Sequence, residues 1–165
     1  VLFRSDVSFY RPEQVLRGLN ETFQMGDQNQ KYFTIWYGVL NCANRQLLYA
    51  SAGHPPALLV SLDGDRAIHS QRLCTPGVPV GMLSESAYTW NQCHIPPQSR
   101  LYLFSDGLYE IWNPDQDYLG LDAFVELVTS SPGRTGVDGI LDRIKLHQAS
   151  QAALDDMSLV MVEIT

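Results

Sequence analysis

The period of the hydrophobic positions changes along the chain and divides it into predicted helices and strands. A first helix begins at Pro12, where proline suits the first helical turn, and Leu16, Leu19 and Phe23 form its apolar face. From there the pattern changes to short strands that are rich in aromatic and β-branched side chains. The predicted strands are residues 32–40 and 47–50, which form a hairpin, residues 57–60 and 66–70, which form a second, and one strand within residues 87–95.

The best defined strand is the apolar run Leu101–Phe104, which predicts a strand buried on both faces. It stops at Ser105, Asp106 and Gly107, so a carboxylate stands at the end of a core strand. Two helices follow, and the run Met157–Ile164 predicts another fully buried strand. The apolar stripes of the two helices consist of Leu121, Phe124, Val125 and Val128, and of Val137, Ile140, Leu141 and Ile144.

Two acidic positions that are distant in sequence are predicted to meet in space. Asp106 follows one buried strand, whereas Asp155 and Asp156 directly precede another. If the two strands are antiparallel neighbours, Asp106 and Asp155 lie at the same edge of the sheet. Their charges would repel unless a cation lies between them, and Mg²⁺ and Mn²⁺ prefer carboxylate oxygens as ligands.

Simpler alternatives remain open for each acidic motif taken alone. Asp106-Gly107 is a common turn signal after a strand. Asp155-Asp156 is compatible with a plain loop or with a capping pair. Only the combination of the two motifs indicates a metal site.

The order of the predicted elements indicates an α+β fold. A helix, several antiparallel strands, two helices and a strand imply a layered domain rather than a repeat of β-α-β units. The 165 residues, 45% of them hydrophobic, suit one domain with a sizeable core.

Composition excludes several classes of partner. The formal net charge is −7 and the chain has no basic run, so we expect no nucleic acid partner. No apolar run approaches the ~18 residues that span a bilayer, so we expect no membrane contact within this segment. The three cysteines are odd in number and lack metal-ligand spacing, which indicates free thiols, small buried side chains and a cytoplasmic location.

Five short motifs occur in an order that points to a known family. They are Phe33-Thr34 with Tyr37-Gly38, Ala52-Gly-His-Pro-Pro56, Gly77-Val-Pro-Val-Gly81, Ser105-Asp-Gly107 and Asp155-Asp-Met-Ser158. In order and approximate spacing they resemble the SpoIIE-like branch of the PPM-type (type 2C) metal-dependent serine/threonine phosphatases. The resemblance covers about residues 12–165. It implies a four-layer α-β-β-α sandwich of two antiparallel sheets flanked by helices, with a two-metal Mn²⁺ or Mg²⁺ site at one edge.

The resemblance assigns roles to individual residues of this chain. It implies that Asp106 and Asp155 are metal ligands and that Gly107 permits close packing around Asp106. It implies that Asp156 is a turn residue or lies outside the metal ligands. His54, which also suits a general acid, corresponds to a connector between strands that lies away from the metals.

One part of the family pattern is missing. Members of the family carry another metal-binding Asp-Gly, often within Asp-x-x-Gly-His-Gly, well before the helix that begins here at Pro12. Asp6-Val-Ser8 matches its first letters only, and Phe9-Tyr10-Arg11 replaces Gly-His-Gly, so we do not expect Asp6 to be that ligand. We therefore expect residues 1–11 to be a truncated or artefactual start. Residues 12–165 would form one partial domain that lacks its first strand or strands and first helix, binds metal weakly and is inactive in isolation.

The resemblance implies hydrolysis of phosphoserine or phosphothreonine on a small regulatory protein by a metal-activated water, with no catalytic side chain. By family analogy the substrate is an anti-anti-sigma factor of the STAS type, and an upstream sensor or receiver domain controls the enzyme in bacterial signal transduction. One alternative is a degenerate phosphatase fold that binds such a regulator without catalysis. Another is a generic β-sandwich whose acidic turns are coincidental. The oligomeric state stays open, a dimer included.

Overall fold

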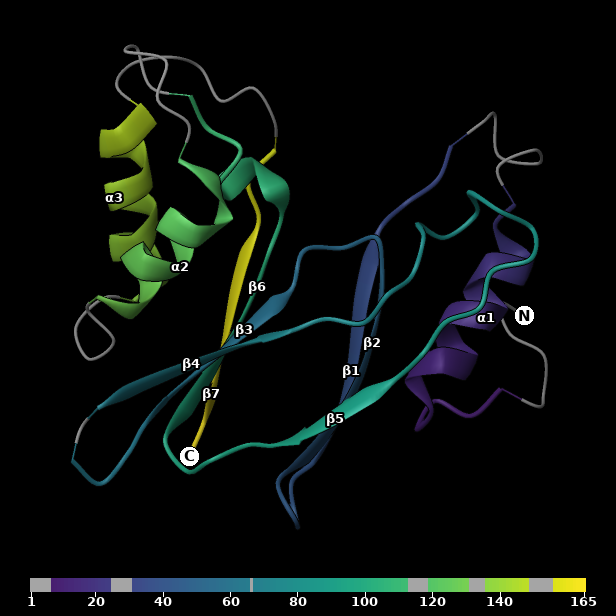
Figure 1. Cartoon of the computed structure of the whole chain (residues 1–165), viewed down its shortest axis with the longest axis horizontal. Helices are drawn as coiled ribbons and strands as arrows, with labels where there is room; N and C mark the ends of the chain where they lie inside the picture. The colour runs from purple at the N-terminus through teal and green to yellow at the C-terminus, as the bar shows by residue number, and fades with distance from the viewer. Residues whose placement is uncertain (1–6, 25–30, 66, 113–118, 131–135, 149–155) are drawn as a thin grey trace. The chain divides into compact units, whose positions relative to one another are not determined.

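The computed structural model describes residues 7–24, 31–65, 67–112, 119–130, 136–148 and 156–165, which contain helices and two antiparallel sheets (Figure 1). The predicted α+β class with two antiparallel sheets is confirmed. The elements are α1 (Pro12–Thr22), β1 (Ile35–Asn41), β2 (Gln46–Ala52), β3 (Ala57–Leu62), β4 (Ile68–Leu73), β5 (Asn91–His94), β6 (Ser99–Phe104), the 3₁₀ turn Asp106–Leu108, α2 (Gly120–Thr129), α3 (Val137–Gln148) and β7 (Leu159–Ile164).

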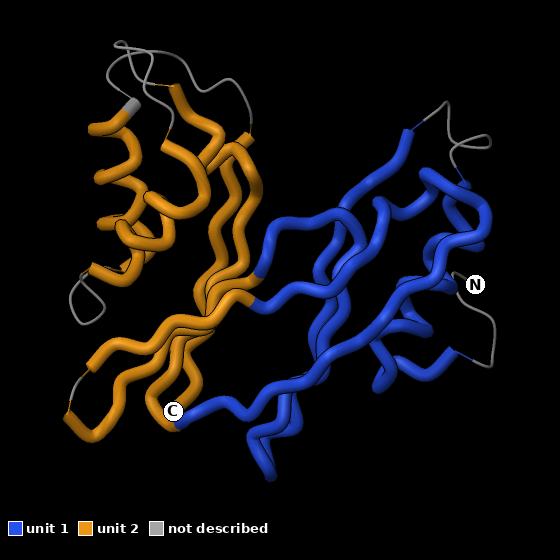
Figure 2. The backbone as a smooth tube through the Cα atoms, viewed as in Figure 1, with its two compact units in different colours: residues 1–56, 73–96 blue, residues 57–72, 97–165 orange. Residues whose placement is uncertain are grey.

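The chain forms two compact units, and each contains one of the sheets (Figure 2). Unit 1 consists of residues 1–56 and 73–96, and unit 2 consists of residues 57–72 and 97–165. The sheet of unit 1 has the strand order β1-β2-β5, and that of unit 2 has the order β4-β3-β6-β7. None of the helices in the described ranges is both long and apolar enough to cross a membrane.

Unit 1 contains the predicted hairpin and the predicted first helix. β1 and β2 pair antiparallel, with Gly38 opposite Tyr49. The helix α1 begins at Pro12, and its fully buried Leu16 packs with Ala50 and Val80 in the core of this unit. An amphipathic helix is stabilised mainly by burial of its apolar face, which explains why the sequence pattern located α1 correctly.

Two loops of unit 1 pack closely against each other. The Gly53 N–H donates a 2.8 Å hydrogen bond to the Gly77 carbonyl. Gly53 has a φ of +67°, and a Cβ at this position would lie 2.6 Å from Pro79 Cγ. A Cβ at Gly77 would lie 2.4 Å from the Ser51 carbonyl oxygen. Both positions therefore require glycine, and the two sequence motifs form one interlocked structure.

His54 lies in the connection between β2 and β3, where the sequence placed it. Its carbonyl accepts a 3.1 Å hydrogen bond from the Ser51 hydroxyl, and its ring Nδ1 lies 2.9 Å from the Pro55 carbonyl oxygen. These contacts of its ring and carbonyl are thus with residues no more than three positions away in the sequence.

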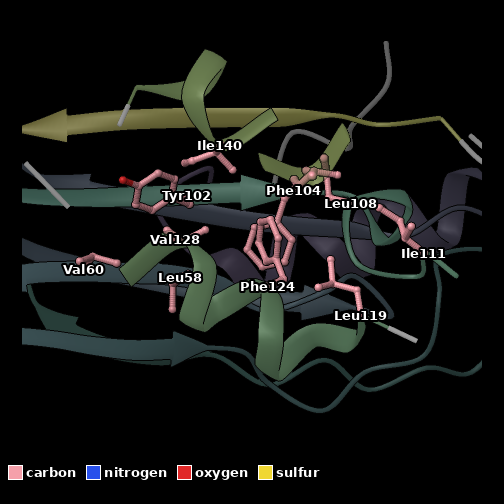
Figure 3. Packing of buried hydrophobic residues seen from close by; sticks show 11 residues of the cluster. Leu58, Val60, Tyr102, Phe104, Leu108, Ile111, Leu119, Phe124, Val128 and Ile140 are labelled. Carbon is pink, nitrogen blue, oxygen red and sulfur yellow. The ribbon is translucent and has the colours of Figure 1, made fainter. Parts of the chain in front are cut away.

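Unit 2 has its core between the sheet and the helices α2 and α3 (Figure 3). Phe104, at the end of β6, lies with its ring centroid 4.7 Å from that of Phe124 on α2. The predicted apolar stripes of the two helices provide much of this core. Its buried members are Leu58, Val60, Tyr102, Phe104, Leu108, Ile111, Leu119, Phe124, Val128, Ile140 and Ile144.

The structure corrects three expectations from the sequence. β7 is not fully buried: Leu159 and Met161 pack on the core, but Val160 and Val162 are 55% and 40% exposed. The reason is that β7 is an edge strand whose side chains alternate between the helix-covered face and the opposite face. Strand β1 begins at Ile35 rather than at residue 32. Two of the thiols, Cys42 and Cys74, are exposed rather than buried.

Candidate metal centre

The end of β6 and the beginning of β7 lie side by side in unit 2. The two strands pair antiparallel along their whole length, and the last pair is Phe104 with Leu159. The residues that follow β6 and those that precede β7 therefore come to the same edge of the sheet. This is the arrangement that the sequence reasoning required for a shared cation site.

Three hydrogen bonds extend the contact beyond the last strand pair. The Ser105 N–H donates to the Ser158 carbonyl at 3.0 Å. The Ser158 N–H donates to Ser105 Oγ at 2.9 Å, and Ser105 Oγ donates to the Asp156 carbonyl at 3.0 Å. We call these three bonds the Ser105 bracket. The bracket joins the residue that precedes Asp106 to residues 156 and 158, which follow Asp155.

Asp106 is fixed by its backbone while its side chain stays accessible. Its carbonyl accepts hydrogen bonds from the N–H groups of Tyr109 and Glu110 at 2.9 and 2.8 Å, which close the turn. Its Oδ1 accepts the Gly107 N–H at 3.1 Å. Asp106 is exposed, whereas Leu108, two residues later, is fully buried and anchors the turn in the core. A carboxylate is thus presented to solvent from a hydrogen-bonded turn that is anchored in the core.

Of the other predicted site residues, Gly107 and Asp156 are among the residues that the structure describes, and Asp155 is not. Gly107 is buried within the turn, and its role in close packing around Asp106 stays a prediction. Asp156 is exposed, and its carbonyl belongs to the Ser105 bracket. Asp155, the second predicted ligand, lies outside the described residues, as does Asp6. The structure therefore brings Asp106 next to the segment that directly follows Asp155.

The donor chemistry at this edge suits a hard divalent cation. The Asp106 carboxylate offers an accessible oxygen, which is the type of ligand that Mg²⁺ and Mn²⁺ prefer. Within the part of the chain that the structure describes, no three His, Cys, Asp or Glu side chains form a metal-binding group. The pairing of Asp106 with Asp155 as ligands stays a prediction.

Sequence reasoning missed the contribution of Ser105. In the sequence Ser105 stands out only as the residue at which a buried strand stops and as the first member of the motif Ser105-Asp-Gly107, although its Oγ makes two of the three bonds of the bracket. The signal available in the sequence is a residue that can both donate and accept a hydrogen bond, placed where a buried strand must end.

The chain matches a known family over nearly all of its length. Residues 3–165 match the family described as "Stage II sporulation protein E (SpoIIE)". Protein IcfG from Synechocystis is 27% identical over 135 residues, which is 79% of this chain and 20% of IcfG. Phosphoserine phosphatase RsbP from Bacillus subtilis is 29% identical over 94 residues, which is 57% of this chain and 22% of RsbP. The matched region thus spans about a fifth of the length of each curated relative.

Solved phosphatase domains share the fold. The SiaA-PP2C domain of Pseudomonas aeruginosa matches with a TM-score of 0.73 at 16% identity, over 94% of this chain and 62% of that chain. RsbX in complex with magnesium matches with a TM-score of 0.59 at 14% identity, over 92% of this chain and 63% of that chain. At these identities the matches establish a common fold.

Proposed function

This chain belongs to the SpoIIE family, as its motifs indicated, and from that membership we propose that it is part of a metal-dependent phosphatase that acts on phosphoserine or phosphothreonine. The name of the relative RsbP, phosphoserine phosphatase, supports this choice of substrate group. We propose that residues 12–165 form one partial domain of the family.

The observation that carries the proposal is the antiparallel pairing of β6 with β7, which ends at Phe104 and Leu159. This pairing, together with the Ser105 bracket, brings the exposed Asp106 beside the segment that follows Asp155. We assign Asp106 and Asp155 as metal ligands. In this assignment Asp156 is a turn residue or lies outside the metal ligands.

The chemistry follows from the charge of the substrate, because a phosphate dianion repels an approaching nucleophile. When bound, two Mn²⁺ or Mg²⁺ ions would neutralise phosphoryl oxygens and lower the pKa of a water. In this assignment Asp106, which is exposed at the edge of the sheet, and Asp155 would hold the ions, and no side chain has to attack phosphorus. The magnesium in the RsbX structure supports the choice of a hard divalent ion.

The partners are proposed on family grounds. We propose a small phosphorylated regulator of the STAS type as substrate, in the partner-switching control of a sigma factor, and a sensor or receiver domain upstream in the same protein. A cytoplasmic location agrees with three cysteines that are all free.

The test is Mn²⁺-dependent hydrolysis of p-nitrophenyl phosphate by the whole protein. We expect Asp106→Asn and Asp155→Asn each to lower the rate on the order of 100-fold or more, because each removes a charged ligand. The matched control is Asp142→Asn, which removes an exposed carboxylate of α3 that pairs with Lys145 at 3.7 Å. Full activity in both site variants would overturn the metal assignment. Mn²⁺ binding without hydrolysis by the unaltered protein would favour the non-catalytic binding module.

A further inference from the structure

We propose that Ser105 is a positioning residue whose hydroxyl sets the separation of the two acidic segments. The inference rests on the proposed function, since the segments are those that carry Asp106 and Asp155. The Ser105 side chain is assigned no contact with substrate. It acts through the backbone of the neighbouring segment.

The backbone geometry shows why a side chain is needed at this point. β6 must stop pairing after Phe104 so that the chain can enter the turn that presents Asp106. The Ser105 carbonyl is accordingly used within that turn, where it accepts the Leu108 N–H at 3.3 Å. In a continuing ladder a backbone carbonyl would accept the Ser158 N–H, but here Ser105 Oγ accepts it at 2.9 Å. The hydroxyl therefore replaces the carbonyl that has turned away.

A hydroxyl is chemically specific for this position. Ser105 Oγ accepts one hydrogen bond and donates another, to the Asp156 carbonyl at 3.0 Å. Serine and threonine can do both, whereas alanine and valine can do neither. The backbone of Ser105 is extended, with φ −82° and ψ 163°, a conformation that β-branched residues adopt without strain.

The consequence for the site follows from adjacency in sequence. Asp106 is the next residue after Ser105, and Asp155 is the residue before Asp156. The bracket thus fixes the backbone directly beside each proposed ligand. Groups that orient metal ligands through hydrogen bonds typically change metal affinity by about 10- to 100-fold when they are removed.

The experiment compares Ser105→Thr with Ser105→Val, because these variants have the same shape and differ only in the hydroxyl. Mn²⁺ affinity of the whole protein is measured by electron paramagnetic resonance, and exchange of the Ser158 amide hydrogen is measured in the metal-free state. We expect Ser105→Thr to retain both properties. We expect Ser105→Val to weaken Mn²⁺ binding by about 10-fold or more and to speed exchange of the Ser158 amide.

A matched control is available in the same unit. Ser130 donates to the Leu127 carbonyl at 3.1 Å and accepts a hydrogen bond from Arg143 at 3.0 Å, so it also has one donated and one accepted bond. The bond from Arg143 joins the end of α2 to α3, and the bond to Leu127 is local to the end of α2, so neither joins β6 to β7. We expect Ser130→Ala to leave Mn²⁺ affinity unchanged.

Two results would overturn the positioning role. One is equal Mn²⁺ affinity in Ser105→Thr and Ser105→Val, and the other is loss of folding in both. If the unaltered protein binds Mn²⁺ and the threonine and valine variants bind it equally, only the role of Ser105 fails. If the unaltered protein binds no Mn²⁺, both the proposed function and the role of Ser105 fail.

Discussion

The side chain of Asn20 and the backbone N–H of Gly81 are joined by a 2.8 Å hydrogen bond, although 61 positions separate the two residues. The same Oδ1 accepts a 3.3 Å hydrogen bond from the Tyr88 hydroxyl, and Nδ2 donates to the Leu83 carbonyl at 2.9 Å. Asn20 is only 2% exposed. One buried amide therefore fastens α1 to the loop between Gly81 and Tyr88.

Replacement of Asn20 by alanine should be strongly destabilising. It leaves the Gly81 N–H and the Tyr88 hydroxyl without their acceptor in a buried place, and we expect the free energy of unfolding to fall by about 2–4 kcal/mol. Urea denaturation provides the measurement. Asn91→Ala, at an exposed position of β5, is the control and should change stability by about 0.5 kcal/mol or less. Equal effects of the two substitutions would show that the buried amide is not a structural fastener.

Gly53→Ala should destabilise the interlocked loops of unit 1. The new Cβ would lie 2.6 Å from Pro79 Cγ on a backbone with φ +67°, and strain and overlap together should cost about 2–3 kcal/mol. Gly64→Ala is a matched control, because a Cβ at Gly64 would have no described heavy atom within 4 Å. Thermal unfolding of both variants tests the difference. A midpoint as low for Gly64→Ala as for Gly53→Ala would contradict the packing explanation.

Phe104→Ala should weaken the core that supports the metal edge. Phe104 is 2% exposed and packs against Phe124 and Tyr109, with ring centroids 4.7 and 6.2 Å away. We expect a loss of about 3–5 kcal/mol in chemical denaturation. Leu146→Ala on α3 is the control, since Leu146 is 81% exposed and should contribute little. A small loss in Phe104→Ala would mean that the end of β6 is not anchored by this cluster.

Stability should fall at alkaline pH through Tyr102. Burial raises the pKa of the Tyr102 phenol above its ordinary value of 10.0; Arg100 opposes this shift and Glu163 adds to it. Between the unfolded and the folded pKa the phenol is neutral in the folded protein but ionised in the unfolded chain. The stabilisation is therefore complete only below the unfolded pKa. It is lost as the pH rises towards the folded pKa.

The measurement for Tyr102 is the free energy of unfolding as a function of pH, for the unaltered protein and for Tyr102→Phe. Above about pH 10 the curve of the unaltered protein should fall more steeply, by at most about 1.4 kcal/mol per pH unit for this group. Other buried phenols contribute to both curves and cancel in the difference. Parallel curves would contradict the raised pKa of Tyr102.

Much of the fold was predictable because it depends on local patterns. The apolar faces of α1, α2 and α3 and the buried run of β6 are visible in the sequence, since each buries one continuous set of side chains. The extent of burial of β7 was not predictable. An apolar run is compatible with a central strand and with an edge strand. The structure places β7 at the edge, with Leu159 and Met161 on the core and Val160 and Val162 exposed.

The candidate site was predictable only in part. Asp106 at the end of a strand follows from the sequence, and its approach to the segment after Asp155 follows if β6 and β7 are neighbours, which the structure confirms. The bonds of Ser105 depend on the exact pairing register and were out of reach of sequence reasoning. The sequence also could not show that Gly53 packs against Pro79, because this contact joins two loops through tertiary packing.

The position of β6 in its sheet has a consequence for protein synthesis. β6 pairs with β3 on one side and with β7 on the other, and β7 is made after α2 and α3. While the ribosome makes α2 and α3, the β7 side of β6 is an open edge that carries the apolar run Leu101–Phe104. Such an edge can recruit a strand from another nascent chain. Pairing with β7 therefore closes this edge to other nascent chains.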